Sequence, residues 1–270
     1  MVPLSARADL STDEEVSLRH VRHFLGAYDR FLIAPRGSGA GREGFRTLEF
    51  SHRFFGSATA HHRLLMWPGF YGAFRNYQYI LIHHLDSLTL SDDLERWCAA
   101  GWDYIGAPWL PCDDTPWVKE AHVGNGGFTL MKVSSALDVL RNRHRMKPYS
   151  YVGDALIRNG DWLRPLFRGV ARLVRPGLRP APLARLLQYW ELHEDLAANG
   201  CNNDYFWSFE AVRYLPSFSV APVAEGLRFA FEAAPRTCFE LNHRQMPFGC
   251  HAWPKFDRAF WEPHLLTVDP

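Results

Sequence analysis

The sequence predicts an α/β fold: a single domain with a mainly parallel central sheet flanked by helices. The 270 residues are enough for one large domain with its own core. Helical and strand-like patterns alternate along the chain, which is typical of this class. The run from Tyr79 to Asp86 is apolar and ends in polar groups. Such a run is expected of a central parallel strand whose carboxyl end meets a ligand crevice.

Composition narrows the range of functions before any motif is considered. Hydrophobic residues make up 47% and charged residues 22%, which indicates a globular chain. Thirty Lys and Arg against 29 Asp and Glu give a formal charge of +1, which excludes the broad positive field of a nucleic-acid-binding protein. The five cysteines form no C-x-x-C pair, and no apolar stretch has the length of an export signal or a membrane span. These features predict a cytoplasmic protein.

The first half of the chain is expected to alternate between helix and strand. Ser11 and the acidic residues after it indicate the start of a helix over 11–28, which should end near Gly26. The elements that follow are predicted in this order: a strand at Phe31–Pro35, a glycine-rich loop at 36–44, a strand at Thr47–Phe50, a helical stretch at 61–75 that is interrupted at Pro68, and the strand at Tyr79–Asp86.

The second half continues the alternation. We expect a short helix at 92–100, a strand and turn at 103–109, a strand at 127–131, a helix that starts at Ser134, and helices at 183–198 and 205–212.

A helical, arginine-rich insertion is predicted at about residues 155–198. Seven arginines lie between Arg158 and Arg185, where Asp161 is the one acidic residue. Arginines at 164, 168 and 172 are four apart and therefore share one helical face. Two interpretations are open: an amphipathic helix with a solvated arginine face, or a basic helix that contacts an anionic membrane surface.

Polar side chains concentrate in four short clusters, at 83–87, 123–128, 201–206 and 247–253. His84 and Asp86 are two apart on the predicted strand, so they face the same side and could hold one cation. The alternative is that Asp86 caps a helix or anchors a loop.

The other clusters also allow two interpretations each. Glycines around Asn125 permit close approach of a ligand to the backbone, but their spacing matches neither the dinucleotide fingerprint nor the P-loop. Classical nicotinamide and ATP chemistry are therefore disfavoured. Asp204 is either a functional carboxylate against aromatic surface or the N-cap of the next helix. His251 is either a ligand or a structural histidine.

At these clusters the sequence resembles a bacterial family of unknown function that is grouped with A-type glycosyltransferases of polysaccharide gene clusters. The resemblance covers roughly residues 11–262. It is carried by Arg63-Leu64 before Phe70-Tyr71, Tyr79-Ile80-Leu81-Ile82 before Leu85-Asp86, Asp103-Tyr104-Ile105-Gly106-Ala107-Pro108-Trp109, Gly124-Asn125-Gly126-Gly127-Phe128, Asn202 with Asp204, Phe231-Glu232, and Pro247-Phe248-Gly249-Cys250-His251-Ala252-Trp253.

The resemblance implies a GT-A-like, Rossmann-like domain that moves a sugar from a nucleotide-diphosphate sugar to a glycan or lipid-linked acceptor. A divalent cation, Mn²⁺ or Mg²⁺, would stabilise the leaving diphosphate. It implies Asp86 as the main metal ligand with help from His84 and His251, and imidazole favours Mn²⁺ over Mg²⁺. Asp204 would be the base of an inverting transfer. The pocket would contain Asn125, Gly126 and Gly127, with Trp109 and Trp253 as stacking surfaces.

This sequence also departs from the pattern of the family. His61-His62 replaces the usual Tyr-Asn, and Asn203 replaces a Glu. In A-type folds the first strand forms part of the nucleotide pocket, and here it is expected to be nearly absent because the sequence starts at Met1-Val2-Pro3. This suggests a late start site or weakened donor binding. A catalytically inactive nucleotide-sugar or carbohydrate-binding protein is therefore the alternative function. A metal-dependent hydrolase would use the thirteen histidines, but no H-E-x-x-H spacing supports it.

Overall fold

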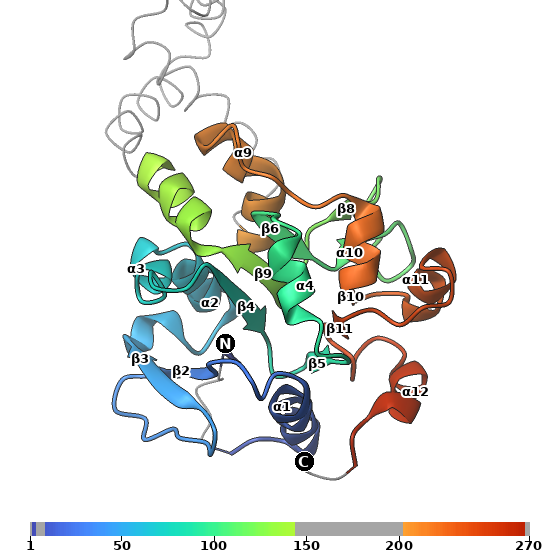
Figure 1. The fold of residues 1–270 in the computed structure, drawn as a ribbon, viewed down its shortest axis with the longest axis horizontal. Coiled ribbons are helices and arrows are strands. Elements are labelled where there is room, and N and C mark those ends of the chain that lie inside the picture. Colours follow the sequence, from blue (N-terminus) through green and yellow to red (C-terminus); the bar gives the residue numbers. More distant parts are fainter. Residues whose placement is uncertain (1, 4–8, 144–201, 268–270) are drawn as a thin grey trace, which may run out of the picture.

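The computed structural model describes residues 2–3, 9–143 and 202–267, and it confirms the α/β class (Figure 1). The predicted insertion at 155–198, including the arginine-rich segment, lies outside the described residues. The strands are β1 (Val2–Pro3), β2 (Phe31–Pro35), β3 (Arg46–Phe50), β4 (Tyr79–His83), β5 (Leu88–Thr89), β6 (Tyr104–Gly106), β7 (Pro108–Trp109), β8 (His122–Val123), β9 (Phe128–Lys132), β10 (Ala230–Phe231) and β11 (Gly249–Cys250).

The described helices cover both ends of the chain and its middle. They are α1 (Thr12–Phe24), α2 (Ala58–Leu65), α3 (Pro68–Gly72), α4 (Leu94–Ala99), a helix over 133–143, α8 (Asn203–Tyr205), α9 (Ala211–Tyr214), α10 (Val223–Phe229), α11 (Pro235–Leu241) and α12 (Arg258–Trp261). Short 3₁₀ turns at η1 (His52–Phe54) and η4 (Glu262–His264), and a π-helical turn at η3 (Phe206–Glu210), complete the described elements.

Helix α1 begins where the sequence predicts. The Ser11 side chain accepts a hydrogen bond from the Glu14 backbone N–H, and the Glu14 carboxylate accepts one from the Ser11 N–H. This reciprocal pair satisfies two backbone donors that the first turn would otherwise leave unpaired. Pro68 likewise separates α2 from α3, because a proline fits the first turn of a helix but not its interior.

The central sheet differs from the prediction in the direction of its strands. Strands β1, β2 and β3 are parallel, in the order β1-β2-β3, and β1 also contacts β4. However, β4 pairs antiparallel with β9, and β6 pairs antiparallel with the other edge of β9. The mainly parallel sheet was therefore the wrong prediction. A buried apolar run is covered on both faces whichever way its neighbours run, so composition could not reveal the direction.

A small third sheet brings the C-terminal part of the chain to the end of β4. Strand β10 pairs in parallel with β11, and β11 pairs antiparallel with β5, the strand that follows β4 in sequence. This sheet joins residues 230–231 and 249–250 to the segment directly after Asp86. Residues far apart in sequence are thereby held close together on short strands.

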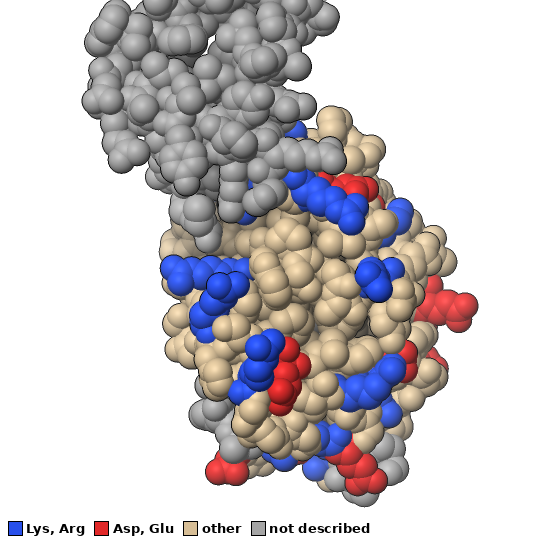
Figure 2. All heavy atoms as spheres, turned by 90° about the vertical axis from the view of Figure 1, so that its left-hand side faces the viewer, with Lys and Arg blue, Asp and Glu red and all other residues tan. Residues whose placement is uncertain are grey.

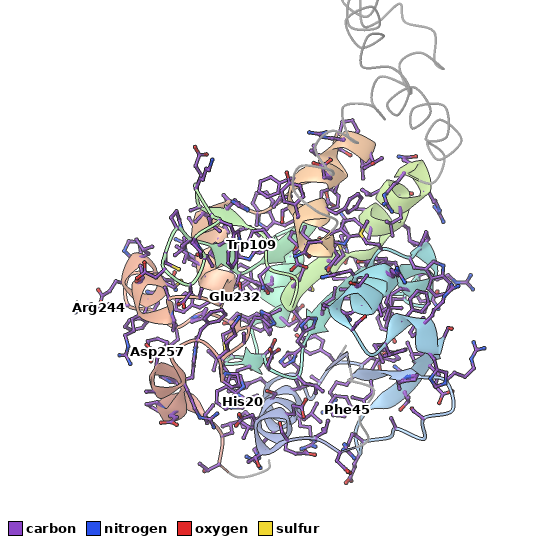
Figure 3. All side chains as sticks on the ribbon, turned by 180° about the vertical axis from the view of Figure 1, so that it is seen from behind. His20, Phe45, Trp109, Glu232, Arg244 and Asp257 are labelled. Atoms are coloured by element: carbon purple, nitrogen blue, oxygen red, sulfur yellow. The ribbon has the colours of Figure 1, made fainter. Side chains whose placement is uncertain are left out.

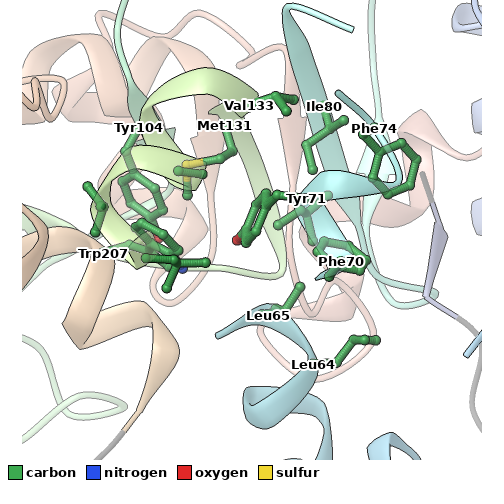
Figure 4. Close-up of a cluster of buried hydrophobic side chains, with 14 of the residues drawn as sticks. Leu64, Leu65, Phe70, Tyr71, Phe74, Ile80, Tyr104, Met131, Val133 and Trp207 are labelled. Atoms are coloured by element: carbon green, nitrogen blue, oxygen red, sulfur yellow. The ribbon is translucent and has the colours of Figure 1, made fainter. Parts of the chain in front are cut away.

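Aromatic side chains fill the core between the sheet and the helices. Figure 4 shows Phe70, Tyr71 and Phe74 facing Tyr104 and Trp207 across Met131. Tyr71 and Trp207 lie edge to face, with ring centroids 5.6 Å apart. This layer packs β4 and β9 against α2, α3 and the helical segment after residue 202. It therefore provides a rigid base for the side chains at the carboxyl end of β4.

The surface carries both signs of charge. Figure 2 shows Lys and Arg side chains scattered among other residues on one face of the molecule. Among residues 2–3, 9–143 and 202–267, no helix is both long and apolar enough to cross a membrane.

Candidate functional site

Three potential metal ligands lie together where the turn after β4 meets the end of β11. Ligand atoms of His84, Asp86 and His251 all lie within 4.8 Å of one another. The backbone N–H of His84 donates to the Gly127 carbonyl at 2.8 Å, and the Ser87 hydroxyl donates to the same carbonyl at 3.1 Å. The Asp86 side chain is 48% exposed, so its carboxylate is open to a ligand.

His251 reaches this turn from β11 and lies between two carboxylates. Its Nε2 is 3.4 Å from Asp86 Oδ1, and its Nδ1 is 2.8 Å from Glu232 Oε1. Backbone bonds hold both sides of the arrangement: His251 N–H donates to Phe231 O at 2.9 Å, and Trp253 N–H donates to Asp86 O at 3.1 Å. Figure 3 labels Glu232 on the segment after β10.

Asp204 forms a second part of the site and does not cap its helix. The N-cap of α8 is Asn202, whose side chain accepts from the Asp204 backbone N–H at 3.0 Å. The Asp204 carboxylate instead lies against Gly126, where an added methyl group would overlap it. The N-cap interpretation of Asp204 is therefore wrong, and its carboxylate remains available for another role.

Three consecutive loop residues each contact a different acid or base of the site. Asn125 Nδ2 donates to Glu232 Oε1 at 2.6 Å. A methyl group at Gly126 would overlap Asp204, and one at Gly127 would overlap the His251 ring. The two glycines are therefore required by close packing, because only a residue without Cβ leaves room for both side chains.

The Asn125 side chain forms hydrogen bonds within the protein through both its oxygen and its nitrogen. Its Oδ1 accepts from the N–H of Gly127 at 2.8 Å and from that of Phe128 at 3.4 Å, while its Nδ2 binds Glu232. The residue is 4% exposed. Asn125 therefore shapes the loop and holds Glu232, whereas the predicted contact with a sugar would have to come from neighbouring residues.

The two aspartates have pKa values that are displaced in opposite directions. Burial raises the pKa of Asp204 to about 6, and the nearby charges of His62 and His251 offset only part of that rise. Burial would also raise the pKa of Asp86, but its hydrogen bond to His251 and the charges of His251 and His84 outweigh burial. The pKa of Asp86 is therefore held below its usual range.

The pKa values of His84 and His251 are also displaced in opposite directions. Burial lowers the pKa of His84 well below its ordinary value, and the neighbouring His61 and His251 lower it further. Burial would lower the pKa of His251 too, but hydrogen bonds to Asp86 and Glu232 raise it to about 10. His84 is thus a neutral imidazole at pH 7, as a metal ligand must be, whereas His251 must release a proton before it can bind a cation.

Comparison with known proteins identifies the family. A family model described as a protein of unknown function (DUF5672) matches residues 44–251. The chain belongs to the DUF5672 family. No curated protein and no solved structure matches it.

The DUF5672 match contains the whole site. Asp86, the 125–127 loop, Asp204 and Glu232 lie within it, and His251 is its last residue. Of the two aromatic residues that were expected to stack on a ligand, Trp253 lies outside the match and is completely buried, with its indole N–H donating to Ser17 Oγ at 3.2 Å. Trp253 has no exposed face, so its predicted stacking role was wrong.

Trp109 keeps part of its surface accessible. Its ring packs over Gly124 and meets His122 edge to face, with centroids 5.1 Å apart. His122 in turn contacts Phe209, a residue that is 36% exposed. Trp109 therefore begins a short aromatic row that leads from the loop of the DUF5672 site to η3, and its role in stacking stays a prediction.

The three residues that were interpreted from the sequence as departures from the resembled family lie together at this site. His61 Nε2 lies 3.0 Å from His84 Nε2, and His62 Nδ1 contacts Asn203 Oδ1. Two of the unusual residues, His62 and Asn203, are therefore partners of each other, although they are 141 positions apart in sequence. Only the fold could show that these two residues meet.

Sequence reasoning missed Glu232 and His61 as site residues. Glu232 was visible only as part of the Phe231-Glu232 string, and His61 only as a departure from the family pattern. Neither residue belongs to a sequence motif that would indicate a function. Their partners, His251 and His84, are 19 and 23 residues away. The pairing of β10 with β11 brings Glu232 to His251, whereas His61 reaches His84 from helix α2.

Proposed function

We propose that this DUF5672 protein is a metal-dependent glycosyltransferase that uses a nucleotide-diphosphate sugar and inverts the configuration at the anomeric carbon. One observation carries the proposal: a strand-end cluster of His84, Asp86 and His251 lies beside a separate carboxylate, Asp204, with a raised pKa. Cation binding and proton abstraction need different environments, and the two parts of this site supply them.

The strand-end cluster is suited to a divalent cation. His84, Asp86 and His251 would hold it, and their mixed nitrogen and oxygen donors favour Mn²⁺ over Mg²⁺. A cation bound there would supply positive charge to the diphosphate as negative charge accumulates on it. The exposed face of Asp86 leaves room for those phosphate oxygens.

Asp204 is suited to activate the acceptor. A general base works best when its pKa lies near the operating pH, and burial moves the pKa of Asp204 to about 6. Its carboxylate would take the proton from an acceptor hydroxyl. The hydroxyl oxygen then forms the new bond to the anomeric carbon, and the bond from that carbon to the diphosphate breaks with its electron pair on the departing nucleoside diphosphate.

The acceptor is proposed to be a glycan or a lipid-linked sugar. The partly exposed rings of Trp109 and Phe209 offer flat apolar surface on which a sugar ring could pack, and Trp109 lies over Gly124 of the loop that also contacts Asp204. Contact with the inner face of a membrane through Arg158–Arg185 stays a prediction from the sequence, and so does a cytoplasmic location.

A panel of nucleotide sugars tests this function. We expect one or more donors to release nucleoside diphosphate in the presence of Mn²⁺, slowly with water and faster with an acceptor, and release should stop in EDTA. The Asp86→Ala variant should lose this release, whereas Asp92→Ala, at an exposed aspartate six residues later, should keep it. Donor binding without release would support the inactive binding protein instead. Absence of both binding and release across the panel would contradict the proposal.

A further inference from the structure

Glu232 is a carboxylate of the site that contacts two protein side chains, His251 and Asn125, through a single oxygen. Its side chain is 12% exposed, and the same oxygen, Oε1, contacts His251 Nδ1 at 2.8 Å and Asn125 Nδ2 at 2.6 Å. An ionised carboxylate can only accept hydrogen bonds. Both nitrogens must therefore donate to it, which fixes the proton of His251 on Nδ1.

Strand pairing sets this contact. In the parallel pair of β10 and β11, Phe231 lies opposite Cys250. Glu232 and His251 are the residues that directly follow these two on their strands. The bond from His251 N–H to Phe231 O extends the pairing by one step. The carboxylate and the ring are thus positioned by backbone hydrogen bonds between short strands, which is more rigid than placement on a free loop.

With Nδ1 donating to Glu232, the other nitrogen of His251 is turned towards the strand-end turn. Nε2 lies 3.4 Å from Asp86 Oδ1. The ring of His84 is also close, with its centroid 5.3 Å from that of His251. Metals bind the unprotonated nitrogen of a histidine, and the partner of the other nitrogen decides which one that is.

We propose that Glu232, held by Asn125, is the positioning residue of the cation site: it keeps the proton of His251 on Nδ1 and presents Nε2 to a cation shared with Asp86 and His84. This inference rests on the proposed cation site. It gives the 125–127 loop a defined function, because Asn125 supplies the donor that holds Glu232 while Gly127 leaves space for the ring.

The test is the affinity for Mn²⁺ alone, measured by electron paramagnetic resonance of the free ion. Glu232→Gln should weaken Mn²⁺ binding about 10- to 100-fold, the usual effect of losing such a partner. Glu232→Asp, which keeps the charge but withdraws it by one methylene, should give an intermediate loss and serves if the Gln variant folds poorly. The matched control is Glu225→Gln on α10, where the native carboxylate pairs with Arg228. This substitution should leave the affinity for Mn²⁺ unchanged.

A second readout separates positioning from a structural role. In the Zn²⁺-bound protein, ¹⁵N resonances of His251 should show a protonated Nδ1 and a metal-bound Nε2, and Glu232→Gln should disturb this pattern while far-ultraviolet circular dichroism stays unchanged. If wild type binds Mn²⁺ and Asp86→Ala does not, but Glu232→Gln binds as wild type does, the positioning role is overturned. If wild type binds no Mn²⁺, the cation site itself fails and the inference fails with it.

Discussion

Asp86 and Asp204 belong to one site, yet their surroundings shift the pKa values of the two carboxylates in opposite directions. Asp86 is half-exposed beside His251, which keeps its pKa low, whereas Asp204 is packed against Gly126, and burial raises its pKa to about 6. One carboxylate stays ionised for a cation, and the other can take up a proton. The comparison shows how a single residue type acquires two roles from its surroundings.

The largest expected effect comes from Asp204→Asn. The amide keeps the size of the side chain but cannot accept a proton, so turnover should fall by roughly 10²- to 10⁴-fold with donor binding nearly unchanged. Steady-state kinetics and calorimetric titration of the donor measure the two quantities. At pH 8 the variant should melt no earlier than wild type, because burial disfavours the charge it removes. Early melting with a retained rate would make Asp204 a structural residue.

Asp86→Asn is expected to act on binding. Loss of the charged ligand should weaken Mn²⁺ binding by at least about tenfold, and Mn²⁺-dependent binding of a nucleoside diphosphate should weaken with it. Isothermal titration calorimetry measures both. Asp92→Asn is the control, since that aspartate is exposed and outside the cluster. Unchanged Mn²⁺ affinity in Asp86→Asn would show that Asp86 only anchors the turn.

Two neighbouring glycines allow each half of the site to be disturbed separately. Gly126→Ala should displace Asp204 and lower turnover while Mn²⁺ affinity is kept. Gly127→Ala should displace the His251 ring and lower Mn²⁺ affinity. Each overlap should also destabilise the protein by about 1–3 kcal/mol. Gly72→Ala, in α3 with open space around it, is the control and should change neither property. The same functional loss in both variants would mean that the two halves are not separable.

The smallest expected effect is on stability as a function of pH, measured by calorimetry in EDTA. Burial lowers the pKa of His61 to about 4 and that of His83 to about 3, so the unfolded chain takes up more protons and stability falls as pH drops below about 6.5. His251, with its pKa raised to about 10, contributes stability that is complete below 6.5 and is lost as pH rises towards 10.

The melting temperature should therefore be highest near pH 6.5. His251→Gln should flatten the alkaline side of the curve and leave the acid side in place. A curve of the variant that falls on the alkaline side as steeply as that of wild type would show that His251 is not the residue responsible.

Local chemistry explains which elements the sequence predicts well. Helix α1 is fixed by the Ser11 and Glu14 capping box, and β2 has the predicted bounds because an apolar run ends at Pro35. Strand direction was not predictable, since the apolar residues of β4 are buried in the same way beside a parallel or an antiparallel neighbour. The cap of α8 was also ambiguous, because Asn202 and Asp204 are both good capping residues.

The candidate site was predictable in part. His84, Asp86 and His251 were expected together and lie together, although their binding of a cation stays a prediction. The predicted strand to Asp86 was too long, because β4 ends at His83, and His84 and Asp86 meet in the turn after it. Glu232 could not be found from the sequence because its role depends on the register between β10 and β11. The contact between His62 and Asn203 likewise depends on how α2 packs against α8. Trp253 was misjudged because a sequence does not tell a buried tryptophan from an exposed one.

The most direct test of the contrast between the two aspartates is a nuclear magnetic resonance titration of their side-chain carboxyl carbons in metal-free protein. Asp86→Asn and Asp204→Asn assign the two signals. We expect Asp204 to titrate near pH 6 and Asp86 to remain ionised below its ordinary pKa of 3.8. Titration of both carboxyls near 3.8, or of Asp86 above Asp204, would contradict the division of roles between the two halves of the site.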